Sequence, residues 1–202
     1  MEKKPFLFNK IATVYGLFFN GQVKNYRNIF DTIKKEFDFS QYQSVIDIGS
    51  GTGALCKVLQ EWGLEVTGLD PAEAMLKIAR KKTISKDPDR SDIDFVWGDV
   101  LKGLPFCDKS FDLAISSYVA HGLSPKSRKL LYEEMKRVTR HTVVFYEYNQ
   151  QRSLLTDIVE FMEGGDYFNF ILTIKSELKR EFGNLKVINT GPRSALYICQ
   201  ID

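Results

Sequence analysis

The sequence predicts an α/β fold in which a doubly wound, mostly parallel sheet is covered by helices. From residue 44 onward, short apolar runs typical of buried strands alternate with amphipathic helical patterns. Such alternation implies parallel pairing with right-handed crossovers. The last two strand patterns, 185–190 and 195–201, are separated only by Gly191-Pro192-Arg193. This connection is too short for a helix, so we expect a closing antiparallel hairpin in which the last strand runs against the sheet.

The elements can be assigned in order from their periodicity. Five strand patterns precede the hairpin, at residues 44–49, 64–70, 93–99, 111–117 and 142–148. Helical patterns occupy residues 54–62, 71–82 and 124–140, and a further one ends at residue 184. The first 40 residues carry two apolar stripes at helical spacing, one around Tyr15 and one around Ile29. We expect two amphipathic helices there, lying against the rest of the protein.

Composition indicates one domain of ordinary size. The chain has 202 residues, of which 44% are hydrophobic and 27% charged, as in soluble globular proteins. We expect a single domain over 1–202, with an N-terminal helical lid (1–40), a core (41–149), a lid insert (150–175), and a terminal helix and hairpin (176–202). The longest apolar run is far shorter than the ~20 residues of a membrane helix, and no cleavable leader is recognisable. We therefore expect a cytoplasmic protein.

Charge and cysteine content argue against several partners. The net charge of +2 gives no overall field for nucleic acid or a membrane surface. The three cysteines, Cys56, Cys107 and Cys199, are far apart and form no C-x-x-C pair, so neither a metal site nor a disulfide framework is expected. The oligomeric state is left open by the sequence.

Three glycines follow the first strand at alternate positions in VIDIGSGTGAL, residues 45–55. Gly49, Gly51 and Gly53 would let a ligand approach the backbone of this strand-to-helix turn. The same letters can be parsed as a G-x-G-x-x-A dinucleotide fingerprint. The turn alone therefore does not choose between ligands.

An acidic residue stands at the end of each of the first three strands. Asp47 lies inside the first strand, two residues before Gly49, Asp70 ends the second strand 19 residues after Gly51, and Asp99 follows the third. A carboxylate at the position of Asp70 can accept hydrogen bonds from both hydroxyls of a ribose. Asp47 would sit badly beside a pyrophosphate but suits an ammonium group. This pattern favours S-adenosylmethionine over a dinucleotide.

With these motifs the chain resembles the class I S-adenosylmethionine-dependent methyltransferases, closest to the branch acting on quinones and small molecules. DIGSGTG (47–53), LDPAEAML (69–76), GDV (98–100) and FDLAISSYVAHGL (111–123) are similar to the family's first four motifs. The resemblance covers residues 44–148 by motif and the terminal hairpin by topology. It implies a seven-stranded Rossmann-like methyltransferase sheet. One departure is Thr139-Arg140-His141, which stands where the family usually has a proline-glycine-glycine turn.

The resemblance also implies roles for individual residues. Asp47 would hold the amino group of the cofactor, Asp70 its ribose and Asp99 its adenine amino group, while the N-terminal Tyr15 would cover it. The cofactor residues implied in this way are Tyr15, Asp47, Gly49, Ser50, Gly51, Gly53, Asp70, Pro71, Met75, Gly98, Asp99, Val100, Ser116 and Ser117. For Met75 and Tyr15, packing of an apolar helix face explains the residue equally well.

The fourth motif leads, by the same resemblance, past the sulfonium to the substrate. His121 follows the fourth strand and could take a proton from an attacking hydroxyl or amine, or could simply line the pocket. We expect Tyr118, His121, Phe161 and Tyr167 to contact a small-molecule methyl acceptor. The aromatic residues of the insert could instead bury it against the sheet.

Two other functions stay open at this stage. A nicotinamide oxidoreductase commonly needs a Tyr-x-x-x-Lys pair near the fourth strand, but Gly122 occupies the fourth position after Tyr118. A non-catalytic protein that binds S-adenosylmethionine would keep the same three acids. The sequence therefore favours methyl transfer, with S-adenosylhomocysteine as product, and does not identify the acceptor.

Overall fold

The computed structural model describes residues 4–84, 92–151 and 166–201. In this part of the chain, seven strands form one sheet in the order β3-β2-β1-β4-β5-β7-β6. β2 pairs in parallel with β1 and β3, and β4 with β5, whereas β7 is antiparallel to both β5 and β6. The predicted α/β fold, with a parallel sheet closed by an antiparallel hairpin, is confirmed.

The chain divides into two compact units, Met1–Asp99 and Val100–Asp202, which we call the first and the second unit. The first unit contains α1 (Lys4–Ile33), η1 (Phe39–Gln41), β1 (Ser44–Ile48), α2 (Ala54–Glu61), β2 (Glu65–Asp70), α3 (Glu73–Thr83) and β3 (Asp94–Trp97). The second unit contains η2 (Val100–Lys102), β4 (Phe111–Ser117), η3 (Ala120–Gly122), α4 (Pro125–Val138), β5 (Thr139–Tyr148), α6 (Tyr167–Phe182), β6 (Leu185–Gly191) and β7 (Ser194–Gln200).

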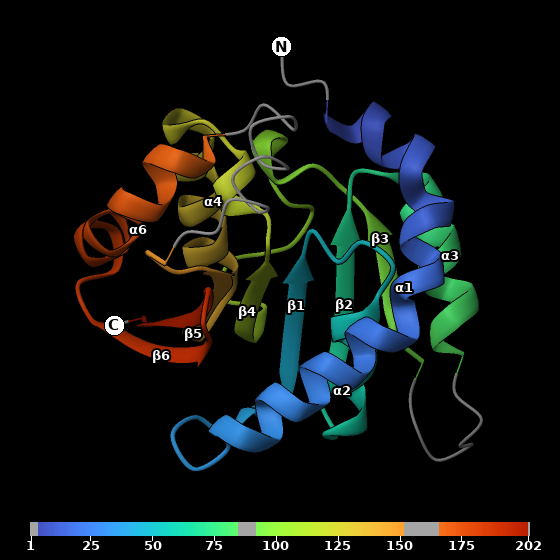
Figure 1. The fold of residues 1–202 in the computed structure, drawn as a ribbon, viewed down its shortest axis with the longest axis horizontal. Helices are drawn as coiled ribbons and strands as arrows, with labels where there is room; N and C mark the ends of the chain where they lie inside the picture. Colours follow the sequence, from blue (N-terminus) through green and yellow to red (C-terminus); the bar gives the residue numbers. More distant parts are fainter. Residues whose placement is uncertain (1–3, 85–91, 152–165, 202) are drawn as a thin grey trace. The chain divides into compact units, whose positions relative to one another are not determined.

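The two apolar stripes predicted near the N-terminus lie on one continuous helix, α1, rather than on two helices. No proline follows Pro5 in this stretch, and isolated glycines such as Gly16 weaken a helix without ending it. Gly16 is buried, and a Cβ atom there would lie 3.4 Å from the Ile78 side chain on α3. α1 packs along both α2 and α3 (Figure 1).

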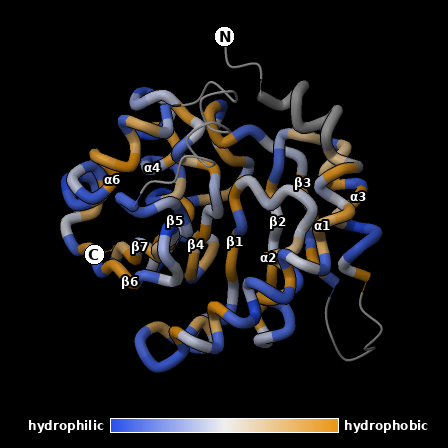
Figure 2. Tube along the Cα trace, in the orientation of Figure 1, coloured by the Kyte–Doolittle hydropathy of each residue, from blue (hydrophilic) through white to orange (hydrophobic). Residues whose placement is uncertain are grey.

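Parallel pairing in the first unit sets the strand ends side by side. Ile48, the last residue of β1, is in register with Leu69, and Asp70 is in register with Trp97. The apolar residues of β1 form a hydrophobic strand in Figure 2, and Val45, Ile46 and Ile48 are at most 1% exposed. The turn after β1 therefore begins beside the carboxyl end of β2, where ligands bind in sheets of this kind.

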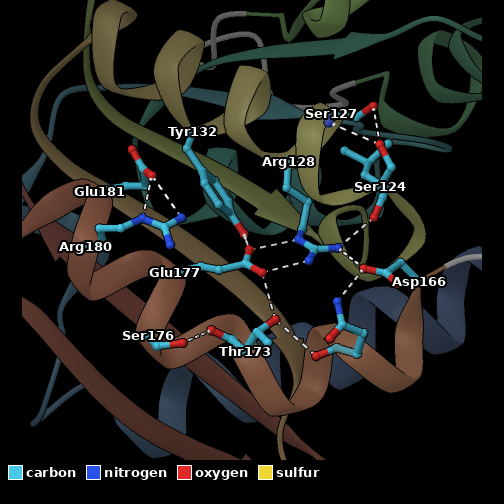
Figure 3. Close-up of polar contacts among 12 residues, drawn as sticks. Ser124, Ser127, Arg128, Tyr132, Asp166, Thr173, Ser176, Glu177, Arg180 and Glu181 are labelled. Carbon is cyan, nitrogen blue, oxygen red and sulfur yellow. Dashed lines mark hydrogen bonds and ion pairs between the residues drawn. The ribbon is translucent and has the colours of Figure 1, made fainter.

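A buried arginine joins two helices of the second unit. Arg128 on α4 has no exposed side-chain area, and its guanidinium donates to both carboxylate oxygens of Glu177 on α6 at 2.9 and 2.7 Å. The same group donates to Asp166 at 2.8 Å and to the carbonyl oxygen of Leu123 at 2.7 Å (Figure 3). Burial alone would lower the pKa of Arg128, but these carboxylates raise it above its ordinary value. The arginine stays charged and fixes the start of α6 against α4.

Among the described residues, every helix is too short or too polar to cross a lipid bilayer.

Candidate active site

The turn after β1 is shaped by glycine. Gly49, Gly51 and Gly53 have φ angles of 80°, 52° and 77°, a region that other residues rarely adopt. The N–H groups of Gly49 and Ser50 both donate to the carbonyl oxygen of Leu69, at 2.8 and 3.0 Å. The turn is thus tied to the end of β2.

The glycines differ in what surrounds them. A Cβ atom on Gly53 would lie 2.8 Å from the Phe95 ring, whereas a Cβ on Gly51 would have no neighbour within 4 Å. Gly53 therefore lets the start of α2 pack closely on β3, and the open space lies beside Gly51. The backbone at Gly51 is therefore open on its Cβ side, where an atom of a ligand could lie against it.

Asp47 is buried at the base of this turn, and only one of its two carboxylate oxygens has a hydrogen-bond partner in the part of the chain that the structure describes. Its Oδ2 accepts from the Cys56 thiol at 3.2 Å, while Oδ1 has no hydrogen-bond partner among the described residues. The hydroxyl of Ser50 is likewise buried without a described partner. Burial raises the pKa of Asp47 to about 7, although the thiol hydrogen bond acts in the opposite direction. An unpaired buried carboxylate oxygen is expensive, so this site suits a cationic ligand group.

The raised pKa predicts an unusual pH dependence for the ligand-free protein. Between pH ~4 and 7 the folded state holds a proton on Asp47 that the unfolded chain has released, so stability falls as the pH rises through this window. Each unit of pKa difference corresponds to about 1.4 kcal/mol, which gives a loss on the order of 4 kcal/mol. Denaturant unfolding of the wild type and Asp47→Asn measures this effect. The free energy of unfolding of Asp47→Asn, relative to that of the wild type, should therefore be higher at pH 7.5 than at pH 4.5. A stability difference between Asp47→Asn and the wild type that does not change with pH would contradict the account.

Asp70 already holds the turn together. Its Oδ2 accepts from the Gly51 N–H and its Oδ1 from the Ala72 N–H, both at 2.8 Å. Burial raises the pKa of Asp70, and these two hydrogen bonds oppose that rise. Each oxygen keeps a second lone pair, so the carboxylate can still accept from a ligand hydroxyl. Because Ala72 is the N-cap of α3, Pro71 precedes the helix instead of lying in its first turn.

The remaining predicted cofactor residues of the first unit are Tyr15 and Met75 on helices and Gly98 and Asp99 after β3. Met75 is 3% exposed and belongs to a small core with Ala12 and Ala72, against which Tyr15 packs. A Cβ on Gly98 would lie 2.7 Å from the Leu69 side chain, so any larger residue there would have to displace Leu69. Asp99 follows it and is half-buried. Tyr15 and Met75 thus share one small core, which packing of apolar helix faces is enough to explain.

In the second unit, the predicted residue Tyr118, which directly follows β4, has a strained backbone. Tyr118 has φ = 53°, a conformation that costs a bulky residue roughly 1–2 kcal/mol. Its N–H donates to the Tyr146 carbonyl oxygen at 2.9 Å, which continues the strand pairing past Ser117. Ser116 is fully buried, with no described partner for its hydroxyl, and Val100 begins η2. The backbone is therefore strained at Tyr118, directly after the end of β4.

His121 lies in η3 and is paired with an acid. Its Nδ1 lies 2.9 Å from Oε2 of Glu147 on β5, and both side chains are buried. The ring contacts those of Tyr118 and Tyr148, with centroids 6.3 and 5.0 Å away, at steep angles. Tyr167 begins α6, is 1% exposed and packs its ring against Tyr148 at 5.1 Å. Phe161 lies outside the described residues.

Glu147 was missed from the sequence. It is the one acid in the apolar run TVVFYEY, residues 142–148, and a carboxyl group in a buried strand needs a partner. That signal was available, but its partner His121 lies 26 residues earlier. Cys56, the donor to Asp47, was considered only as a metal or disulfide candidate.

Comparison with known proteins agrees with this architecture. Residues 45–142 match a family model described as a methyltransferase domain. A demethylmenaquinone methyltransferase of Paenarthrobacter aurescens is 32% identical over 148 residues, which are 69% of this chain and 53% of that protein. An uncharacterized methyltransferase of Staphylococcus carnosus is 25% identical over 90% of this chain and 86% of its own length.

The same fold occurs in solved structures. An S-adenosylmethionine-dependent methyltransferase of Thermotoga maritima, described as a possible histamine N-methyltransferase, superimposes with a TM-score of 0.71 at 16% identity. The match covers 98% of this chain and 99% of that one. Family model, sequence relatives and fold together identify residues 45–142 as a methyltransferase domain of the S-adenosylmethionine-dependent class.

Proposed function

We propose that the protein transfers the methyl group of S-adenosylmethionine to a small-molecule acceptor. The observation that carries this proposal is the buried Asp47, whose Oδ1 has no described partner, beside a glycine turn with open space at Gly51. An ammonium group satisfies that oxygen, whereas the phosphates of a dinucleotide would be repelled by it.

The other proposed cofactor contacts come from the family resemblance, and the chemistry of the side chains suits them. Asp70 accepts from the ribose hydroxyls, and Asp99 accepts from the adenine amino group. Tyr15, Pro71 and Met75 supply apolar surface. In the first unit, the backbone and small side chains after β1 and β3 are further proposed cofactor residues, namely Gly49, Ser50, Gly51, Gly53 and Gly98. In the second unit, the proposed cofactor residues are Val100, Ser116 and Ser117.

The cofactor supplies a methyl group on a sulfonium, so the protein need not activate a leaving group. Its own residues must orient the acceptor, exclude water and receive a proton. We propose His121 as the proton acceptor, with Tyr118 and Tyr167 as aromatic walls for the substrate. The first relative acts, by its name, on demethylmenaquinone, which makes aromatic acceptors the first to test. The three free cysteines favour the cytoplasm as the site of this reaction.

A methyl-transfer screen tests the proposal. The protein is incubated with methyl-labelled S-adenosylmethionine and a panel of quinols, phenols, amines and thiols, and labelled product is measured. For the best acceptor, His121→Gln should lower kcat by about 100-fold or more, since a general base contributes roughly 10²–10⁴-fold. The affinity for S-adenosylmethionine should be unchanged.

The chain offers a matched control for this variant. His141 is exposed and is the only other histidine, so His141→Gln should keep full activity. Equal kcat values for His121→Gln and the wild type would remove His121 from the chemistry. A protein that binds the cofactor tightly but methylates no acceptor would favour the non-catalytic alternative.

A further inference from the structure

Glu147 is the most deeply buried carboxylate of the second unit's site, and it is bound on both of its oxygens. Its relative exposure is 0%, and it directly follows the buried apolar residues 143–146 of β5. Oε1 accepts from the N–H groups of Val119 and Ala120 at 2.8 and 2.6 Å. Oε2 faces Nδ1 of His121 at 2.9 Å. One side chain therefore holds both the backbone of η3 and the histidine ring that η3 carries.

This pairing determines which ring nitrogen carries the proton. An ionised carboxylate only accepts hydrogen bonds, so the 2.9 Å contact requires a hydrogen on Nδ1. A neutral imidazole has one N–H, which leaves the lone pair on Nε2. The opposite tautomer would set the lone pair of Nδ1 against a carboxylate oxygen in a buried site, where repulsion is strong.

The ring cannot easily turn away from this arrangement. Tyr118, Tyr148 and Phe170 surround it, with ring centroids 6.3, 5.0 and 6.4 Å from that of His121. All three contacts are steep, at 72°, 77° and 64°, so the rings meet edge to face. Orientation and tautomer are thus fixed by separate contacts, one aromatic and one ionic.

We propose that Glu147 is a positioning residue that fixes His121 in its Nδ1–H tautomer, so that Nε2 receives the proton of a hydroxyl or amine acceptor. This inference rests on the proposed function. The acceptor's oxygen or nitrogen forms the bond to the methyl carbon, and the carbon–sulfur bond breaks with its electron pair left on sulfur. The acceptor's proton passes to Nε2, and the resulting imidazolium is stabilised by the Glu147 carboxylate. An acceptor without a removable proton would not need this pair.

Glu147→Gln separates positioning from simple structural support. The amide has one oxygen and one NH₂ group, and two backbone N–H groups compete with one ring nitrogen for that oxygen. When the amide oxygen faces the η3 backbone it accepts two hydrogen bonds, whereas facing His121 it could accept only one. The NH₂ group therefore faces Nδ1. Nδ1 must then accept, and the ring proton moves to Nε2. Glu147→Gln thus keeps the hydrogen bonds to the η3 backbone and moves the lone pair of the His121 ring from Nε2 to Nδ1.

Nitrogen-15 spectra of the imidazole rings report the tautomer without cofactor or acceptor. The chain has two histidines, so His141→Gln assigns the two sets of signals. At a pH where the rings are neutral, wild-type His121 should carry its proton on Nδ1, and Glu147→Gln should carry it on Nε2. Glu134→Gln is the matched control, because this carboxylate also accepts a backbone N–H, from Leu104 at 2.6 Å, and should leave the His121 tautomer unchanged.

The outcomes separate this inference from the proposed function. A wild-type proton on Nε2 would overturn the inference by itself, even if Glu147→Gln failed to fold. A folded Glu147→Gln that kept the proton on Nδ1 would also overturn it. With an acceptor from the methyl-transfer screen, Glu147→Gln should lower kcat by about 100-fold and leave the KM for S-adenosylmethionine unchanged. Failure to find any methyl transfer would count against the proposed function and would leave the tautomer result standing.

Discussion

Replacing Asp70 by alanine is expected to lower the affinity for S-adenosylmethionine by about 100-fold or more. The variant loses the acceptor proposed for the ribose hydroxyls, and hydrogen bonds to a charged group are worth about 1.5–3 kcal/mol each. Since 1.4 kcal/mol corresponds to a factor of ten, two such bonds give at least that loss. The N–H groups of Gly51 and Ala72 also lose their acceptor, which loosens the turn itself.

Asp70→Asn is the matched control for this effect. The amide oxygen can replace one of the two carboxylate oxygens, so its loss of affinity should be smaller than that of the alanine variant. Calorimetric titration measures both affinities, and thermal unfolding shows whether each variant is folded. Wild-type affinity in folded Asp70→Ala would show that Asp70 acts only as a cap for the turn.

Replacing Arg128 by methionine should lower the free energy of unfolding by about 3–5 kcal/mol. Methionine leaves Glu177 and Asp166 without the cation that both contact, and breaking a buried pair by removing one partner carries a cost of that size. The α6 residues that pack near His121 depend on this cluster, because Arg128 also lies 5.3 Å over the Phe170 ring. Urea unfolding of the wild type and the variant measures the difference.

An exposed arginine of the same unit provides the comparison. Arg140 pairs with Asp112 at 2.9 Å but is 47% exposed, so Arg140→Met should cost no more than about 1 kcal/mol. Equal losses for the two variants would mean that burial of Arg128 adds nothing to its ion pairs. A stabilised Arg128→Met would show that the cost of burying the charge exceeds the gain from pairing it.

Periodicity and local chemistry were enough to predict the sheet and its glycine turn. Strand patterns alternate with helical ones. An acidic residue lies in or at the end of each of the first three strand patterns, namely Asp47, Asp70 and Asp99. Parallel pairing brings such residues close together in space, because the carboxyl ends of adjacent strands meet at one edge of the sheet. The hydrogen bond from Gly51 to Asp70 is a direct consequence, although the two residues are 19 positions apart.

Contacts that depend on tertiary packing could not be predicted in this way. Glu147 meets His121 only because β5 pairs with β4, and Arg128 meets Glu177 across 49 positions. The length of α1 was also missed, since two apolar stripes on one helix resemble two helices when packing partners are unknown. Neither the spacing of these residues nor their type specifies the partner, so a structure was required.

The most direct test of the central claim is a calorimetric titration of ligand-free protein with S-adenosylmethionine, S-adenosylhomocysteine and NAD. The account predicts micromolar binding of the first two ligands, strongly weakened in Asp70→Ala, and no binding of NAD. Binding of NAD alone would contradict it and would assign the glycine turn at residues 49–53 to a dinucleotide.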